Sequence, residues 1–188
     1  MGVDSEHYVQ NDRIDDYVVD GLIGSGSTAK IYEVFHSMSG QRAALKMAIG
    51  EWTCMPMADK IFQAEIETMR NSDHPNIPSF FSEGRVPDAP PFTKPYYVME
   101  FVEGSAPKPV EGEILSILRD SSSALAHYHA QGTLHRDIRP GNMLVGSRGT
   151  YLLDPLPLTE IHLYFGNPMG ELTFLSSHVA RGEIPRQI

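Results

Sequence analysis

Cysteine is nearly absent from this chain, which carries only Cys54 among its 188 residues. No disulfide can form within one molecule, and no metal site can be built from several thiolates. A chain with no disulfide to maintain suits a reducing compartment, so we expect a cytoplasmic protein.

Long apolar runs are absent as well. No stretch approaches the roughly 20 consecutive apolar residues that a membrane-spanning helix needs. The N-terminus is acidic and lacks the basic start and the apolar stretch of a signal peptide. We therefore expect no membrane partner.

Positive charge is scarce, because 15 Lys and Arg residues stand against 24 Asp and Glu, for a net charge of −9. Such a chain would repel a phosphate backbone, so we expect no nucleic-acid partner. Part of the acidic excess lies in residues 1–13, where Asp4, Glu6 and Asp12 stand against Arg13. We expect this acidic N-terminal segment to be disordered.

Five short strands are predicted from alternation and turn residues. Three lie within residues 17–48, joined by a Gly/Ser cluster and a Ser-Gly turn, which suits an antiparallel meander. Two more are expected at residues 79–82 and 96–101. Between these two, residues 84–95 contain four prolines, which predict a stiff surface loop.

Two helices are predicted from apolar side chains at helical spacing. The first covers residues 58–70 and the second residues 113–130, where Gly132 supplies an end signal. From His135 onward the chain has only short apolar pieces separated by Gly, Pro and Asn, so no further long helix is expected.

The most informative motif runs from His135 to Asn142 and reads H-R-D-x-x-x-x-N. Phosphoryl transfer explains this spacing. A carboxylate, Asp137, can lie within reach of an acceptor hydroxyl, while the amide oxygen of Asn142 reaches back to a metal ion on the phosphates. The motif predicts a phosphotransferase site.

A glycine-rich turn between the first two strands is the second motif, and a plain hairpin turn is the competing interpretation. Its backbone amides can cradle phosphates. Fifteen residues past Ile31, the third strand carries Lys46, a suitable cation for the same phosphates. The residues of this turn and its flanks are Ile23, Gly24, Ser25, Gly26, Ser27, Thr28, Ala29 and Ile31.

Lys46 needs an anionic partner to hold its position, and the first helix offers Glu65. This residue lies four positions from both Ile61 and Met69, so it shares the apolar face of the helix and points inward. Glu67 faces elsewhere. We expect an ion pair between Lys46 and Glu65.

Together these segments resemble the protein kinase superfamily, and serine/threonine kinases in particular, from about Tyr17 to His178. The resemblance implies an α+β, two-lobed protein-kinase-like fold. Residues 14–102 would form an N-terminal lobe and hinge, with an antiparallel five-stranded sheet and one helix. Residues 103–188 would form a truncated, mainly helical C-terminal lobe with the catalytic loop, a metal-binding aspartate and a partial activation segment.

The same resemblance implies ATP and Mg²⁺ as cofactors and a protein as substrate. Asp137 would orient and deprotonate the acceptor hydroxyl, with Arg139 near the γ-phosphate, and Asn142 and Asp154 would bind the metal. Lys46 would hold the phosphates, paired with Glu65. The adenine would lie against Ile31, Ala44, Met99, Glu100, Phe101, Val102 and Leu144.

Two departures from the family bear on activity. The metal-binding tripeptide reads Asp154-Pro155-Leu156, and a proline biases the residue before it toward an extended conformation. The segment after Asp154 is also short for the family, so we expect an uncovered apolar surface that favours self-association or a covering partner.

Three functions stay open on this evidence. The first is an active protein kinase that transfers the γ-phosphate of ATP to Ser or Thr, either a minimal kinase, such as those injected into a host cytosol by bacteria, or a truncated one. The second is a pseudokinase that binds nucleotide or acts as a scaffold, and the third is a small-molecule phosphotransferase.

Overall fold

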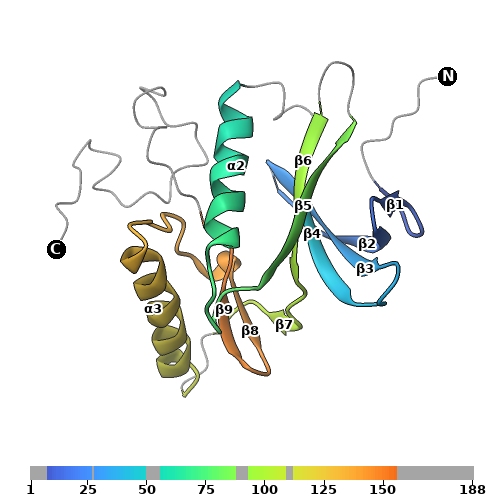
Figure 1. Cartoon of the computed structure of the whole chain (residues 1–188). Helices are drawn as coiled ribbons and strands as arrows, with labels where there is room; N and C mark the ends of the chain where they lie inside the picture. Colours follow the sequence, from blue (N-terminus) through green and yellow to red (C-terminus); the bar gives the residue numbers. More distant parts are fainter. Residues whose placement is uncertain (1–7, 27, 50–55, 88–92, 109–111, 156–188) are drawn as a thin grey trace.

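The computed structural model of the chain describes residues 8–26, 28–49, 56–87, 93–108 and 112–155. They form a six-stranded sheet with one long helix, followed by a three-stranded sheet with a second helix (Figure 1). Within these residues, no helix is both long and apolar enough to cross a membrane. The elements before the second sheet are β1 (Arg13–Ile14), β2 (Tyr17–Ser25), β3 (Ala29–His36), β4 (Arg42–Ala48), α2 (Pro56–Arg70), β5 (Phe80–Pro87) and β6 (Thr93–Glu100).

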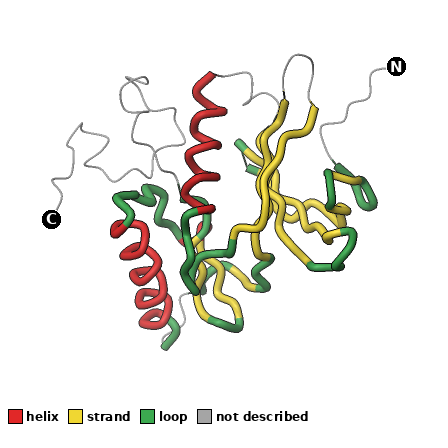
Figure 2. Tube along the Cα trace, viewed as in Figure 1, coloured by secondary structure: helices red, strands yellow, loops and turns green. Residues whose placement is uncertain are grey.

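The large sheet has the order β1-β2-β3-β4-β6-β5, and every neighbouring pair is antiparallel. The five expected strands correspond to β2–β6, and the two-residue strand β1 adds a sixth. In Figure 2, α2 lies beside β5 and β6, the far end of the sheet from β1. The predicted antiparallel sheet with one helix is confirmed, with six strands in place of five.

The proline-rich stretch is more regular than expected. Residues 84–87 and 93–95 belong to β5 and β6 rather than to a loop, and only residues 88–92 lie outside the described part. β5 is an edge strand, and β6 pairs with β4 only as far as Tyr96. Pro87 and Pro95 are therefore tolerated where the strand lacks a neighbour on one side.

The acidic N-terminal segment is also partly ordered, contrary to the expectation for residues 1–13. Residues 1–7 lie outside the described part, but the amide of Asn11 donates to the carbonyl of Val19 on β2. The ring of Tyr8 meets that of Tyr32 edge-on, with centroids 5.9 Å apart. An aromatic contact and backbone hydrogen bonds outweigh the local acidity here.

Two apolar clusters occupy the two faces of the large sheet. Alternation along β4 separates them, because Leu45 and Met47 belong to one cluster and Ala44 and Ala48 to the other. The second cluster also contains Phe62, Ile66 and Met69 of α2, together with residues from the rest of the chain. Lys46 lies on this same face, so its side chain points toward α2.

The second sheet contains β7 (Gly104–Ser105), β8 (Met143–Gly146) and β9 (Gly149–Leu152), and packs against α3 (Ile114–Ala130). A single 3₁₀ turn, Pro140–Asn142, precedes β8. Within the described residues α3 is the one long helix of this part, as the sequence predicts. The predicted partial activation segment falls in residues 156–188, outside the described part.

Candidate active site

Lys46 lies at the centre of the site and contacts two carboxylates. Its Nζ is 2.5 Å from Oε1 of Glu65 on α2 and 2.9 Å from Oδ1 of Asp154, which follows β9. The Lys46 and Glu65 side chains are 9% and 8% exposed. The predicted Lys46–Glu65 pair is present, and Asp154 joins it from 108 residues further along the chain.

The charges of this group influence one another strongly. Burial alone would lower the pKa of Lys46, but the carboxylates of Asp154 and Glu65 raise it above its ordinary value, so the ammonium stays charged. Burial raises the pKa of Glu65, against the influence of Lys46. One buried cation thus holds two anions together.

Tyr97 completes this group, although it was not identified from the sequence as a site residue. Its hydroxyl donates to Oε1 of Glu65 at 2.7 Å, and the residue is fully buried. Tyr97 pairs directly with Lys46 across β4 and β6. The alternation that places Met99 inward also places Tyr97 inward, which is the signal that could have found it. Lys46, Glu65, Tyr97 and Asp154 are called the lysine cluster below.

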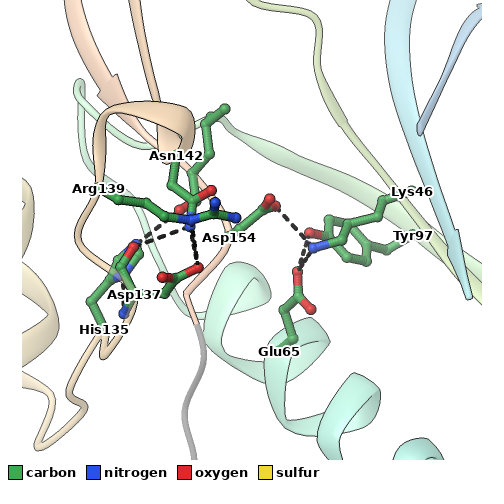
Figure 3. A network of polar contacts seen from close by, with 9 residues as sticks. Lys46, Glu65, Tyr97, His135, Asp137, Arg139, Asn142 and Asp154 are labelled. Carbon is green, nitrogen blue, oxygen red and sulfur yellow. Dashed lines mark hydrogen bonds and ion pairs between the residues drawn. The ribbon is translucent and has the colours of Figure 1, made fainter. Parts of the chain in front are cut away.

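The H-R-D motif forms a second group, the loop cluster, made of His135, Asp137, Arg139 and Asn142 (Figure 3). The side-chain amide of Asn142 donates to Oδ2 of Asp137 at 2.6 Å and to its carbonyl at 3.0 Å. Nε of Arg139 donates to the same Oδ2 at 3.2 Å. Among the described residues these bonds leave Oδ1 of Asp137 available, and the Asp137 side chain is 29% exposed.

His135 connects the loop cluster to the residue before Asp154. Its Nε2 lies 2.8 Å from the carbonyl oxygen of Leu153, which can only accept, so Nε2 carries the proton. The amide of Asp137 donates toward Nδ1 at 3.4 Å. Burial lowers the pKa of His135, which favours this neutral form.

Asp154, a member of the lysine cluster, lies between Lys46 and the loop cluster in Figure 3. The backbone before it is tied to the loop, because the amide of Leu153 donates to the carbonyl of Asn142 at 2.8 Å. The φ angle of Asp154 is +54°, not the extended conformation that a following proline predicts. Asp tolerates the left-handed region better than most residues, and in this conformation its carboxylate reaches Lys46.

The oxygens near Asp154 suit a hard divalent cation. Asp154 offers a carboxylate oxygen beyond the one on Lys46, and Asn142 offers its amide oxygen, since its nitrogen donates to Asp137. Among the described residues no three His, Cys, Asp or Glu side chains gather as a metal site. Two protein ligands fit magnesium, which usually keeps several waters and binds through substrate phosphates.

The glycine-rich turn joins β2 to β3, and β3 lies next to β4, the strand that carries Lys46. Gly24 pairs with Ile31, and Ile31 pairs with Lys46 in the next strand. The amide of Gly26 donates to the carbonyl of Ala29 at 2.9 Å, closing the turn. Ser27 lies outside the described residues.

The residues expected to surround an adenine are brought together in part. Ala44 pairs with Met99 across β4 and β6, both are buried, and Ile31 and Phe101 pack against the same apolar cluster. The other residues expected there, Glu100, Val102 and Leu144, are half-buried. In the glycine-rich turn and its flanks, Ile23, Ser25 and Gly26 are exposed and Thr28 is half-buried.

Two arginines that the sequence did not single out contact residues 100–103, at the end of β6 and directly after it. Arg42 stacks over the ring of Phe101, 3.8 Å from its centroid, and pairs with Glu103. Arg148 pairs with Glu100. A cavity of about 250 Å³ lies here, lined by residues 101–103 and 146–148 together with Arg42 and Tyr151. Its lining contains no residue of the lysine or loop cluster, but it includes Phe101 and Val102, two of the residues expected to surround the adenine.

Comparisons with known proteins agree with this geometry. A sequence model of the protein kinase domain matches residues 17–155. The probable serine/threonine-protein kinase PknB of Lactococcus lactis is 31% identical over an alignment of 182 residues, which covers 89% of this chain and 28% of that protein. PknA of Mycobacterium tuberculosis is 28% identical and is matched over 42% of its length, with 88% of this chain covered. The chain thus spans less than half the length of these relatives.

Solved structures support the fold. A crystal structure of the Mycobacterium tuberculosis PknI kinase domain superposes with a TM-score of 0.65 over 80% of this chain and 63% of that one. The sequence identity is 24%, so the match bears on architecture alone.

Proposed function

Because the chain belongs to the protein kinase family, we propose that it is an active serine/threonine kinase that transfers the γ-phosphate of ATP to a protein hydroxyl. The observation that carries this proposal is the arrangement of Asp154 between Lys46 and Asn142. In this arrangement the groups that we propose to bind phosphate, metal and acceptor hydroxyl would surround one point, which supports the proposal.

The lysine cluster would act on the phosphates. Lys46 keeps its charge because two carboxylates surround it, so it can neutralise the α- and β-phosphates. The amides of the glycine-rich turn can donate to phosphate oxygens. Magnesium, when bound, would supply further charge neutralisation. Asn142 and Asp154 would hold it through their oxygens.

The loop cluster would act on the acceptor. Asn142 and Arg139 hold Oδ2 of Asp137, so Oδ1 can accept the proton of a serine or threonine hydroxyl. The hydroxyl oxygen then forms a bond to the γ-phosphorus as the bond to the β-phosphate oxygen breaks and ADP leaves. A basic residue two positions after the aspartate, here Arg139, supports the serine/threonine assignment.

A nucleotide-binding pseudokinase is the second candidate, and Pro155 favours it. The proline is buried directly after Asp154, and metal sites tolerate little misplacement. In this case the lysine cluster would bind nucleotide while no transfer follows.

Transfer of labelled γ-phosphate from ATP to a generic protein substrate tests the proposal. Phosphoamino acid analysis should find label on serine or threonine, and Asp154→Ala should abolish it. Label on tyrosine alone would overturn the serine/threonine assignment. A folded wild type that binds ATP and transfers nothing would be a pseudokinase.

A further inference from the structure

The position of α2 decides whether Glu65 reaches Lys46, so the contacts that hold this helix are important. One face of α2 is buried through Ala58, Phe62, Ile66 and Met69. An apolar face packs without directional preference, so a small sliding of the helix changes its burial little. Glu65, by contrast, must place one oxygen within 2.5 Å of Nζ of Lys46.

Directional contacts come from the edge strand β5 and reach both ends of α2. Arg85 of β5 places Nη2 at 2.6 Å from Oδ1 of Asp59 in the first turn of the helix. Glu83 of β5 pairs with Arg70 in the last turn. Glu83 and Arg85 are two residues apart, so they extend from the same face of the strand.

Both pairs are supported by further contacts. Nε of Arg85 donates to Oγ1 of Thr93 on β6 at 2.7 Å, which fixes the arginine against the sheet. The guanidinium of Arg70 lies 5.7 Å from the centre of the Phe80 ring. Phe80 stacks with Tyr97, whose hydroxyl binds Glu65. The ends of α2 are therefore linked to β5 and, through it, to β6, the strand that carries Tyr97 and pairs with β4, where Lys46 lies.

We propose that the ion pairs Asp59–Arg85 and Arg70–Glu83 position α2 so that Glu65 engages Lys46, and that they make phosphoryl transfer sensitive to ionic strength. The inference rests on the proposed kinase function. The four residues touch neither substrate nor metal, so they are positioning residues. They act only through the Lys46–Glu65 pair.

The sensitivity to salt follows from exposure. The side chains of both pairs are 36–46% exposed, whereas the Lys46–Glu65 pair is buried. Raising salt from about 0.1 M to about 1 M shortens the Debye length from about 10 Å to about 3 Å, which screens exposed pairs and spares buried ones. Exposed pairs are weak, so each should change the rate about two- to fivefold.

Substitutions on β5 test the proposal without altering the helix sequence. Arg85→Gln and Glu83→Gln each remove one partner. Lys60→Gln and Glu67→Gln are matched controls, because they remove one charge of each sign from exposed positions of α2 for which the structure shows no ion pair with a described residue. Arg85→Lys keeps the positive charge, so its transfer rate and salt dependence should lie close to those of wild type.

Two readouts are combined. At low salt, transfer by Arg85→Gln and Glu83→Gln should be about two- to fivefold slower than transfer by wild type, and their rates should depend less on salt. Hydrogen–deuterium exchange of the α2 amides should speed up in the same variants. Both controls should follow wild type in rate, salt dependence and exchange.

Equal rates and salt dependence in Arg85→Gln, Glu83→Gln and the controls would overturn the proposal. Hydrogen exchange keeps this failure distinct from a failure of the kinase assignment. If wild type transfers no phosphate, faster α2 exchange in the β5 variants alone still supports anchoring of the helix, and unchanged exchange refutes it.

Discussion

The lysine cluster and the loop cluster meet at Asp154 but are built in different ways. The lysine cluster draws Lys46 from β4, Glu65 from α2 and Tyr97 from β6, and these three residues are buried. Its fourth member, Asp154, follows β9 and has a side chain that is 30% exposed. The loop cluster lies within eight positions, His135 to Asn142, and its Asp137 and Arg139 side chains are 29% and 50% exposed.

The difference suggests separate dependences on the fold. Distant elements must pack correctly before the lysine cluster exists, so its loss should affect stability as well as nucleotide binding. The loop cluster is held by local hydrogen bonds, so a change there should affect the chemical step with little effect on folding. The predictions for Lys46, Asn142, Tyr97 and Asp137 test this separation.

The largest expected effect is that of Lys46→Met. The substitution leaves the buried Glu65 and the partly buried Asp154 without their cation. Removing one partner of a buried ion pair costs about 3–5 kcal/mol. We expect a lower free energy of unfolding in urea and loss of ATP binding by calorimetry. An unchanged free energy of unfolding would contradict the claim that the lysine cluster stabilises the fold.

Asn142→Ala should have the next largest effect, on the metal requirement. It removes a proposed ligand and the donor to Oδ2 of Asp137. The Mg²⁺ concentration for half-maximal transfer should rise about 10- to 100-fold. ATP affinity measured without metal should stay near that of wild type. If the Mg²⁺ dependence is unaltered, Asn142 is no metal ligand.

Tyr97→Phe should have a moderate effect on the lysine cluster alone. It removes one hydrogen bond to a charged group, worth about 1.5–3 kcal/mol. ATP should bind more weakly, and the variant should unfold at lower urea concentration than wild type. A normal Mg²⁺ dependence is expected, since Tyr97 does not contact the loop cluster.

The smallest expected effect is a pH dependence from His135. Its pKa is lowered below 6.5 by burial, so the unfolded chain takes up the proton first as the pH falls. The free energy of unfolding should therefore decrease as the pH drops below about 6.5. His135→Gln keeps a donor for the carbonyl of Leu153 and should flatten this profile in part, because burial also lowers the pKa of His74. An identical profile in the variant would exclude His135 as a source of the dependence.

Short-range patterns predicted much of this molecule. The helical spacing predicted that Glu65 points inward, and this was confirmed. Which side chains share a face of a helix depends only on their spacing within that helix. The strands around Lys46 followed from alternation in the same way. The H-R-D motif placed Asp137 and Asn142 within one loop, where spacing nearly determines contact.

Contacts between distant segments were harder to predict. The hydrogen bond from Tyr97 to Glu65 and the ion pair of Arg85 with Asp59 join residues 32 and 26 positions apart, and no local pattern specifies such partners. The prolines of β5 and β6 were misread because their tolerance depends on which strand lies at the edge. The roles assigned to the site residues remain predictions until activity is measured.

The central claim is that ATP binding and acceptor chemistry reside in separate clusters, and Asp137→Asn tests it most directly. ATP affinity and single-turnover transfer should be measured for this variant and wild type in parallel. We predict near-normal ATP affinity and transfer slower by about 10²- to 10⁴-fold. Equal transfer rates would contradict the assignment of Asp137 as the base, and lost ATP binding would contradict the separation of the clusters.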